Sequence, residues 1–468
     1  MFNFVLHKSN MNYFKASLFL VAFFIISGNS FSQTKIWTLN ECVQYAIKNN
    51  ITIQQTALDL QTNAVTKKAA LGSFLPSANA NASHSWNIGL NQNITTGLLE
   101  NQTTQFTSAG VNANITIYNG LQNQNRLRRA NLAILASQYQ LSKIENDVSL
   151  NVANAFLQIL FSKENLKVLL EQLSNDDKQL QRTTELVTAG VVPRGDLLDS
   201  KATVAADKQR IVIAENTLFI SKLSLAQLLQ LEDFRDFDIA SDEANAFQKS
   251  TILNEKPETI LDKAKQERVE LKIAKANLEL AEKDIKIAKG AYQPSLTGFY
   301  GFSSRVSYAD RITGISSTGS PITSGPLPFF DQFSNNKGHN FGMQLNIPIL
   351  NGFSVQNNVA RAKIALERSK IASKQAELDL ERNVYNAIND AKGALNSYES
   401  SLIALEARSE AFNYAKEKFA VGLLNTFTLN QAQTLFTNAQ SEVIRTKFDY
   451  IFKTKVVEFY FGIPLSKN

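Results

Sequence analysis

An internal repeat constrains this 468-residue sequence more than any other feature. The segment 108–120 recurs as 340–352, at an offset of 232 residues. An upstream segment, 71–77, recurs as 289–295 at an offset of 218. The difference of 14 residues falls in one place, between the two repeated segments, which is typical of a surface loop. The chain therefore consists of two related copies of one structural unit.

Each copy contains two predicted strands. In the second strand of each pair, apolar residues alternate with polar ones over 109–117 and 341–349, which predicts strands with one apolar and one polar face. The first strands, near 76–90 and 294–308, alternate less cleanly. Runs of about ten to fourteen residues are long for globular strands and suit tilted transmembrane strands. A soluble sandwich would need more than two strands per copy.

A long helix follows the second strand of each copy. The stretches Gly120–Gly190 and Gly352–Gly422 contain no proline, and at 1.5 Å per residue each would be about 105 Å long. Apolar residues recur at intervals of seven, which predicts coiled-coil packing, with one four-residue shift of phase. One such run is Val152, Ile159, Leu166, Leu173, Leu180 and Val187.

Two shorter helices complete each copy. An opening helix is predicted over 38–71 and again over 258–289, and a returning helix of about 35 residues follows each long helix. Two helices of this length, placed end to end, would match one long helix. Each copy is therefore expected to form an antiparallel helical pair beside its strands.

The N-terminus is typical of a signal peptide, predicted over residues 1–32. Lys8 precedes the apolar run 17–26, and Ser30 and Ser32 occupy the positions of a cleavage site. The apolar core is too short to span a bilayer, and the alternative is an N-terminal membrane anchor.

The repeat divides the remaining chain into three parts. The first copy is assigned to residues 33–230 and the second to 258–464. The segment 231–257 lies outside both copies and is interpreted as a linker beside the middle of the helices, where the short helices meet.

Composition excludes several functional classes. Lys and Arg number 48 and Asp and Glu number 42, so the net charge of +6 is too small for charge-driven nucleic-acid binding. One cysteine rules out a disulfide framework, and three histidines make a histidine-based zinc site implausible. HExxH, Walker and GxGxxG motifs are absent. We therefore expect no enzyme activity, no catalytic or metal-binding residues and no cofactor.

Four transmembrane strands cannot close a barrel by themselves, because single-chain membrane barrels begin at eight strands. An open sheet edge in lipid would leave backbone groups without hydrogen bonds. The chain must therefore associate with copies of itself around a common axis. Two copies would supply eight strands and three copies twelve, with the larger barrel leaving space inside.

Over residues 36–464 the sequence resembles the TolC-type outer membrane efflux proteins. The resemblance rests on the doubled helix–strand–strand–helix unit, the 70-residue spacing and the two glycine turns. It implies a mixed α and β fold with four strands per protomer, joined in a homotrimer as a 12-strand barrel in the lipid bilayer of the Gram-negative outer membrane. It also implies a coiled-coil helical barrel across the periplasm, a periplasmic adaptor docked on the helical tips, and an inner-membrane pump below.

The tip turns carry the most specific local motif. The segments 188–196 and 419–428 resemble the family's V-G-L-x-x-x-x-D pattern, in which glycine ends one helix and Asp196 or Thr428 can cap or charge the next. Exposed apolar residues at a tip would suit a partner surface, although they could instead fold back onto neighbouring helices. The predicted adaptor-docking residues are Gly190, Val191, Val192, Gly422, Leu423 and Leu424.

The predicted entrance differs from the family pattern in the second copy. Asp196 matches an aspartate of the family, but Phe419 replaces a tyrosine and Leu424 an arginine. Thr428 and Gln431 replace the two aspartates of an acidic ring. We therefore predict an entrance closed by packing and polar contacts, with Phe419 as a constriction residue.

The function predicted from these features is a passive exit duct for small molecules in a tripartite efflux system. The first alternative is the outlet of a type I protein secretion system, which the sequence does not distinguish from an efflux duct. The second is a periplasmic coiled coil without a pore.

Overall fold

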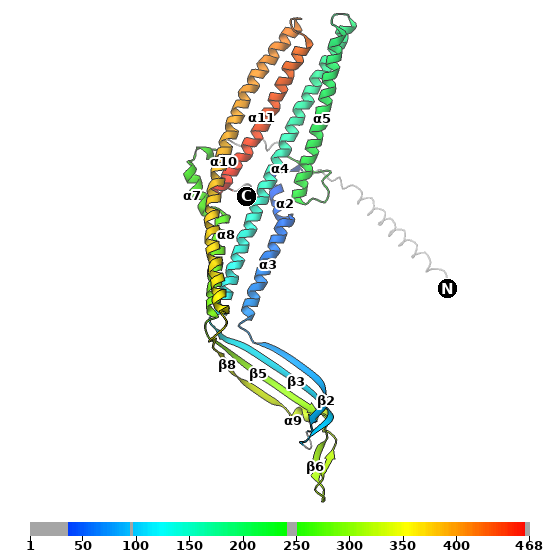
Figure 1. Cartoon of the computed structure of the whole chain (residues 1–468). Coiled ribbons are helices and arrows are strands. Elements are labelled where there is room, and N and C mark those ends of the chain that lie inside the picture. Colours follow the sequence, from blue (N-terminus) through cyan, green and yellow to red (C-terminus); the bar gives the residue numbers. More distant parts are fainter. Residues whose placement is uncertain (1–35, 94–96, 241–249, 464–468) are drawn as a thin grey trace, which may run out of the picture. The chain divides into compact units, whose positions relative to one another are not determined.

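The computed structural model describes residues 36–93, 97–240 and 250–463 (Figure 1). The predicted signal peptide, residues 1–32, lies outside the described residues. The chain divides into two compact units. Unit 1 comprises the chain up to Ile51, Asn146–Ile260 and the chain from Val384 onward, and unit 2 comprises Thr52–Glu145 and Leu261–Asn383.

Unit 2 contains one long antiparallel sheet. Its strands are β2 (Ser77–Gln92), β3 (Leu99–Asn119), β5 (Ser295–Ser307) and β8 (Gly338–Asn346), in the order β2-β3-β5-β8 (Figure 1). These are the four strands that the sequence predicts, although β8 ends at Asn346, before the predicted end at residue 349. The two repeats contribute two neighbouring strands each, and β2 and β8 form the edges.

The register of the sheet separates polar from apolar side chains. Residues directly opposite each other on neighbouring strands point to the same face, and successive rows point to opposite faces. One row contains Asn79, Asn112, Gly301 and Asn340. The next row contains Ala78, Ala113, Tyr300 and Phe341. The alternation read from the sequence therefore continues across all four strands.

The segment between β5 and β8 contains more structure than a surface loop. A short hairpin is formed by β6 (Arg311–Ile315) and β7 (Pro321–Ser324), and its turn includes Gly319 at a φ of +80°. Helix α9 (Phe329–Asn335) then packs on β5, where the Ser304 hydroxyl donates to the Phe333 carbonyl at 2.7 Å. The 14-residue difference between the repeats lies in this region.

The helices of unit 2 meet the sheet at two related turns. Gly120 and Leu121 have φ values of +67° and +61° before α4 (Gln122–Thr188). Gly352 and Phe353 have φ values of +56° and +62° before α10 (Ser354–Ala420). Each turn therefore uses two successive left-handed residues to pass from strand to helix.

The opening helix of each copy is two helices, not one as predicted. The first copy has α2 (Leu39–Asn49) and α3 (Ile51–Gly72), and the second has α7 (Pro257–Glu267) and α8 (Val269–Gly290). Asn50 is extended and donates from Nδ2 to the Leu228 carbonyl at 3.1 Å. Arg268 is also extended and forms an ion pair with Glu270 at 2.8 Å. A side-chain contact thus accompanies the break in each opening helix.

Among its described residues, unit 1 is helical apart from a parallel pair of two-residue strands, β1 (Ile36–Trp37) and β4 (Asp238–Ile239). Its main elements are α2, α5 (Arg194–Leu229), α11 (Thr426–Phe461) and the adjoining halves of α4 and α10 (Figure 1). Fully buried apolar residues fill its core, and they include Val43, Val152, Phe156, Ile159, Leu225, Leu229 and Val457. Val152 and Ile159 come from the predicted seven-residue pattern.

Within the described residues, α5 is the one helix that is long and apolar enough to cross a membrane by length and composition alone. Most of that stretch is exposed in the single chain. The same helix carries the buried Asp207, which contacts α4 through Gln172. We therefore treat the apolar residues of α5 as a packing surface.

Candidate functional site

The turn between α4 and α5 forms the first tip. Helix α4 ends at Thr188, and Gly190 adopts a φ of +73°. The Gly190 N–H donates to the Val187 carbonyl at 3.0 Å, and the following N–H, of Val191, donates to the Leu186 carbonyl at 2.9 Å. Glycine is favoured here because a side chain at this φ would be strained.

Helix α5 begins immediately after this turn. Pro193 is its N-cap residue, with a φ of −64°, and makes no side-chain capping hydrogen bond. Asp196 lies in the first turn, where a negative charge interacts favourably with the positive end of the helix dipole. The structure therefore places Asp196 where the sequence predicts a charge, and its side chain is half-buried.

The turn between α10 and α11 forms the second tip with the same geometry. Gly422 has a φ of +78°, and the N–H of Leu423 donates to the Lys418 carbonyl at 2.9 Å. Asn425 is the N-cap of α11 and accepts from the Thr428 N–H at 2.9 Å. Thr428 does not act as the cap, because its hydroxyl donates to the same Asn425 side chain at 2.7 Å.

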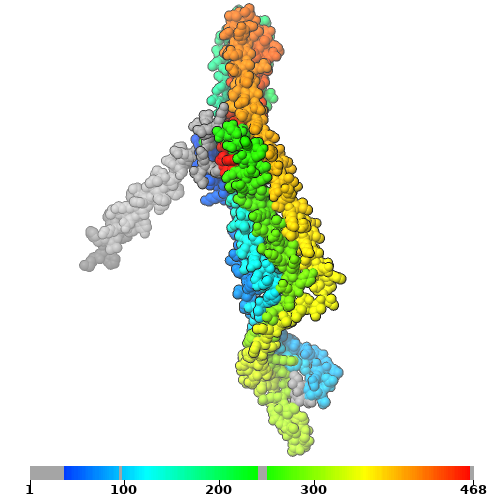
Figure 2. Space-filling view, turned by 90° about the vertical axis from the view of Figure 1, so that its left-hand side faces the viewer, coloured from blue at the N-terminus to red at the C-terminus, as the bar shows by residue number. Residues whose placement is uncertain are grey.

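Both tips expose large apolar side chains, Val191 at the first and Val421, Leu423 and Phe427 at the second. Val191 is 67% exposed and Leu423 is 76% exposed, whereas Val192 and Leu424 are half-buried. The turn between α10 and α11 lies at an uncovered end of unit 1, drawn in orange in Figure 2. Val192 and Leu424, which would fold back onto their own helices, are thus distinct from the exposed residues that a partner could reach.

The predicted entrance residues do not meet within one chain. Phe419 and Thr428 are half-buried, and Gln431 is exposed. In the part of the chain that the structure describes, no hydrogen bond or ion pair joins Asp196 to any of these three residues. A ring of such residues would require several copies of the protein.

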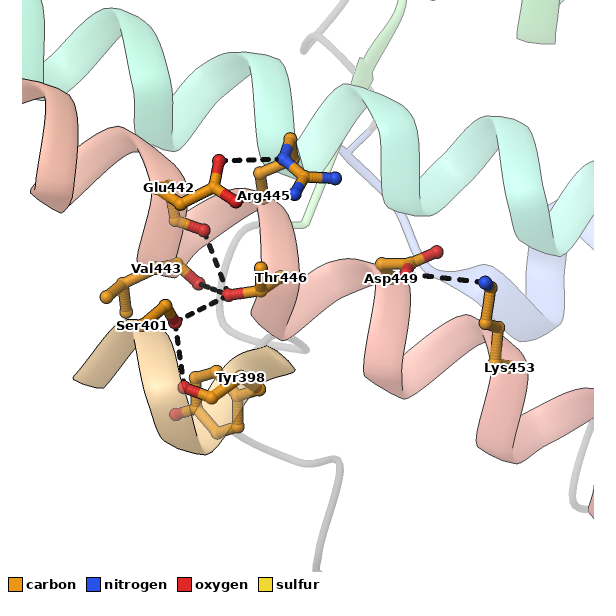
Figure 3. Close-up of polar contacts among 8 residues, drawn as sticks. All are labelled: Tyr398, Ser401, Glu442, Val443, Arg445, Thr446, Asp449 and Lys453. Carbon is orange, nitrogen blue, oxygen red and sulfur yellow. Dashed lines mark hydrogen bonds and ion pairs between the residues drawn. The ribbon is translucent and has the colours of Figure 1, made fainter. Parts of the chain in front are cut away.

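The antiparallel pair of α10 and α11 is held in register by matching side chains. Ser401 and Thr446 are buried, and their hydroxyl oxygens lie 2.8 Å apart (Figure 3). Each hydroxyl also lies within hydrogen-bonding distance of a carbonyl of its own helix, Ser401 of Tyr398 and Thr446 of Glu442, so one hydroxyl donates across the pair while the other donates within its own helix. Tyr398 also stacks on Tyr450, with ring centroids 6.2 Å apart.

Glu442 forms an ion pair with Arg445, which lies about one turn further along α11 (Figure 3). The Arg445 guanidinium holds the pKa of Glu442 below its ordinary value. Both side chains are about half exposed, so this pair contributes little to the packing of the helices.

A buried polar cluster joins three helices of unit 1 and was missed by the sequence analysis. Asp176 on α4 accepts a hydrogen bond from Gln433 on α11, with 2.6 Å between Nε2 and Oδ1. Asp207 on α5 accepts from Gln172 on α4, with 3.1 Å between Nε2 and Oδ1. All four side chains are buried.

The pattern of the sequence contained a signal for this cluster. Asp176 stands three residues after Leu173 and four before Leu180, on the apolar face of the helix. Asp207 has the same relation to Val204 and Ile211. A carboxylate at an inward position of a seven-residue pattern predicts a buried polar contact.

Comparison with known proteins places the chain in a family. The family model described as outer membrane efflux protein matches residues 42–230 and 260–451, so the chain belongs to this family. The match falls on both repeats. The protein is thus a TolC-type outer membrane channel protein, with the helical part of the fold extending into the periplasm.

Individual relatives are distant in sequence. The outer membrane protein TolC of Vibrio cholerae is 24% identical over 318 residues, covering 67% of this chain and 67% of its own length. The pyoverdine export outer membrane protein OpmQ of Pseudomonas aeruginosa is 22% identical, covering 73% of this chain and 66% of its own. The crystal structure of CusC has the same fold, with a TM-score of 0.75, 16% identity and coverage of 90% and 91%.

Proposed function

We propose that three copies of the chain form one channel, and the open sheet carries this proposal. Edge strands β2 and β8 each pair with one neighbour in the described chain. Unpaired backbone groups cannot face lipid, so β2 of one copy must pair with β8 of the next. Three copies then close a barrel of twelve strands, which leaves space for a lumen.

The two faces of the sheet fit lipid and water respectively. On β8, Phe341 is 78% exposed and Met343 is 73% exposed in the single chain. The row of Phe341 continues through Tyr300 and Ala113, and the row of Met343 continues through Gly298 and Ile115 on the same face, so these side chains would face lipid. The alternate row contains Asn112 and its asparagine partners on β2 and β8, and it would line a polar lumen.

The helices of neighbouring copies would extend this barrel as a tube. Helix α5 exposes a set of large apolar side chains that the single chain does not cover, namely Leu198, Val212, Ile213, Phe219 and Ile220. Patches of this kind on a single chain mark contact surfaces. We assign them to contacts between copies around the common axis.

The channel would act as a passive exit duct for small molecules. The family membership and the similarity to a pyoverdine export protein favour efflux over protein secretion. A periplasmic adaptor would bind the tips through Val191 and Leu423, and an inner-membrane pump would deliver the substrate. The chain itself would catalyse no reaction, because a passive duct needs only a lumen and an adaptor that connects it to the pump.

The docking proposal is tested with Leu423→Asp in a strain that lacks the native gene. We expect this variant to reach the outer membrane, to lose the adaptor after mild crosslinking, and to accumulate ethidium. Leu423→Met is the matched control and should retain both adaptor and efflux. Full efflux and adaptor recovery with Leu423→Asp would contradict docking at this tip.

The entrance proposal is tested by introducing a carboxylate. In a trimer, Thr428→Asp would place three carboxylates around the axis if Thr428 lines the entrance. We expect divalent cations to block the single-channel current of this variant more strongly than that of the unmodified channel, because carboxylates ligate such ions. An unchanged cation sensitivity would remove Thr428 from the lumen.

A further inference from the structure

The pair of buried aspartates in unit 1 has no role in the proposed duct. Asp176 is 4% exposed and Asp207 is 3% exposed. Asp176 lies twelve residues before the end of α4, so it is about 18 Å from the tip along the helix. In the second repeat the corresponding residues are Arg408 and Ala439, so the pair is not a requirement of the repeated fold.

The hydrogen bonds of the cluster leave a defined group of oxygens without partners. Asp176 and Asp207 each accept an amide hydrogen bond through Oδ1, from Gln433 and Gln172 respectively. The Oδ2 atoms of both aspartates and Oε1 of Gln172 are buried without a partner. In the described parts of the chain, these three atoms are half of all such buried side-chain atoms.

The charges around the pair are unbalanced if both carboxyls are ionised. Arg210 on α5 is the charged residue in contact, with Nη1 3.5 Å from Oδ1 of Asp207. Helices α4 and α11 present only the amides of Gln172 and Gln433 to the pair, among the described residues. One proton on the pair would leave a single negative charge, which matches the single positive charge of Arg210.

A proton also gives a hydrogen-bond partner to two of these three oxygens, the Oδ2 atoms of the aspartates. Two carboxylate oxygens are both acceptors, so they cannot bond to each other unless one carries a hydrogen. Burial, together with the neighbouring carboxylate of Asp207, raises the pKa of Asp176 from 3.8 to about 7. The group is therefore able to bind a proton near neutral pH.

A metal ion fits this site less well. Calcium requires six to eight oxygen ligands. The described residues contain no group of three or more His, Cys, Asp or Glu side chains that could hold a metal. Arg210 would also repel a cation bound between the two carboxylates.

We propose that Asp176 and Asp207 share one proton and act as a pH-sensitive clasp between α4, α5 and α11. With the proton bound, a carboxyl–carboxylate hydrogen bond joins α4 to α5, while Gln433 joins both to α11. Loss of the proton leaves two like charges buried side by side, which loosens this part of the bundle. The clasp goes beyond the proposed duct and does not require transport.

The sign of the pH effect follows from linkage. Below pH 3.8 the folded and the unfolded chain are both protonated at Asp176. Between 3.8 and about 7 the folded chain keeps a proton that the unfolded chain releases. Stability therefore falls as the pH rises through this window and becomes level above it. Asp176 binds a proton on the order of a thousand-fold more tightly in the folded chain than in the unfolded chain.

The test compares thermal unfolding of the full-length protein in detergent at pH 5 and pH 8. We expect unmodified protein to lose several degrees of Tm between these values. Asp176→Asn supplies a permanent N–H donor in place of the proton, so its Tm should change much less. Asp177→Asn changes an exposed neighbour and should keep the slope of the unmodified protein.

Hydrogen exchange and infrared spectroscopy provide readouts that do not depend on the variants folding. Amides of α4 around residue 176 should exchange faster at pH 8 than at pH 5, beyond the intrinsic effect of pH. The infrared band of a protonated carboxyl should be present at pH 5.5 and absent at pH 8.5. Equal Tm slopes in Asp176→Asn and the unmodified protein, or absence of this band at both pH values, would overturn the proposal. Recovery of the low-pH Tm by calcium at pH 8 would also overturn it, in favour of a cation site.

Discussion

The two strand-to-helix turns of unit 2 allow a prediction with an internal control. Both turns place a glycine at positive φ, but their surroundings differ. A Cβ atom added at Gly120 would lie 2.1 Å from the carbonyl oxygen of Gly290 and 2.9 Å from its carbonyl carbon. A Cβ atom added at Gly352 would meet no atom within 4 Å.

The expected cost of each alanine follows from this geometry. At Gly352 alanine adds backbone strain alone, about 1–2 kcal/mol. At Gly120 it adds the same strain and an overlap with rigid backbone. Relieving that overlap separates the start of α4 from the end of α8 and costs about 1–3 kcal/mol more. Gly120→Ala should therefore lose about 2–5 kcal/mol and Gly352→Ala about 1–2 kcal/mol.

The assay is thermal unfolding of both variants in the same detergent, with the yield of protein in the outer membrane fraction as a second readout. We expect the lower Tm and the lower yield for Gly120→Ala. Gly290→Ala should behave like Gly120→Ala, since its Cβ would lie 2.5 Å from the Gly120 carbonyl oxygen. Equal destabilisation by Gly120→Ala and Gly352→Ala would refute the close approach of the two backbones.

Two further predictions concern unit 1. Burial alone would raise the pKa of Asp238, but hydrogen bonds from Lys163, the following backbone N–H and Lys222 hold it below its ordinary value. Asp238→Asn should therefore lose about 1 kcal/mol at pH 7. In titrations of Tm, this difference should shrink as the pH falls below about 4, where the native carboxylate becomes protonated; a constant difference would contradict the pairing. Phe156→Ala removes a ring that is 0% exposed and should cost about 3–5 kcal/mol by denaturant unfolding. Gln158→Ala, on the exposed side of the same helix, should cost less than about 0.5 kcal/mol, and similar costs for the two would place Phe156 outside the core.

Sequence periodicity accounts for most of the fold, because long elements repeat the same physical pattern many times. The 67-residue helices α4 and α10 end where Gly190 and Gly422 lie just beyond them. The interruptions of the two opening helices involve single contacts and produce no repeating pattern in the sequence. The helix break at Asn50 coincides with a hydrogen bond to the Leu228 carbonyl, 178 residues away in the chain.

The candidate site was predictable in part for the same reason. Local turn chemistry located the tips, because glycine, proline and a capping residue act within one turn. The arrangement of Phe419, Thr428 and Gln431 around an axis is a property of several copies, and a single sequence does not specify it. The cluster of Asp176 and Asp207 could have been predicted from the sequence, because both aspartates interrupt an apolar seven-residue pattern.

The closure of the sheet by neighbouring copies is tested most directly by crosslinking its two edges. In a Cys42→Ala background, which removes the one native thiol, single cysteines are placed at Asn79 on β2 and Gln344 on β8 and treated with a flexible bis-maleimide in intact outer membranes. We predict a ladder of products on denaturing gels that ends at three chains. A ladder that ends at two chains, or the absence of any crosslink between copies, would contradict a twelve-strand channel.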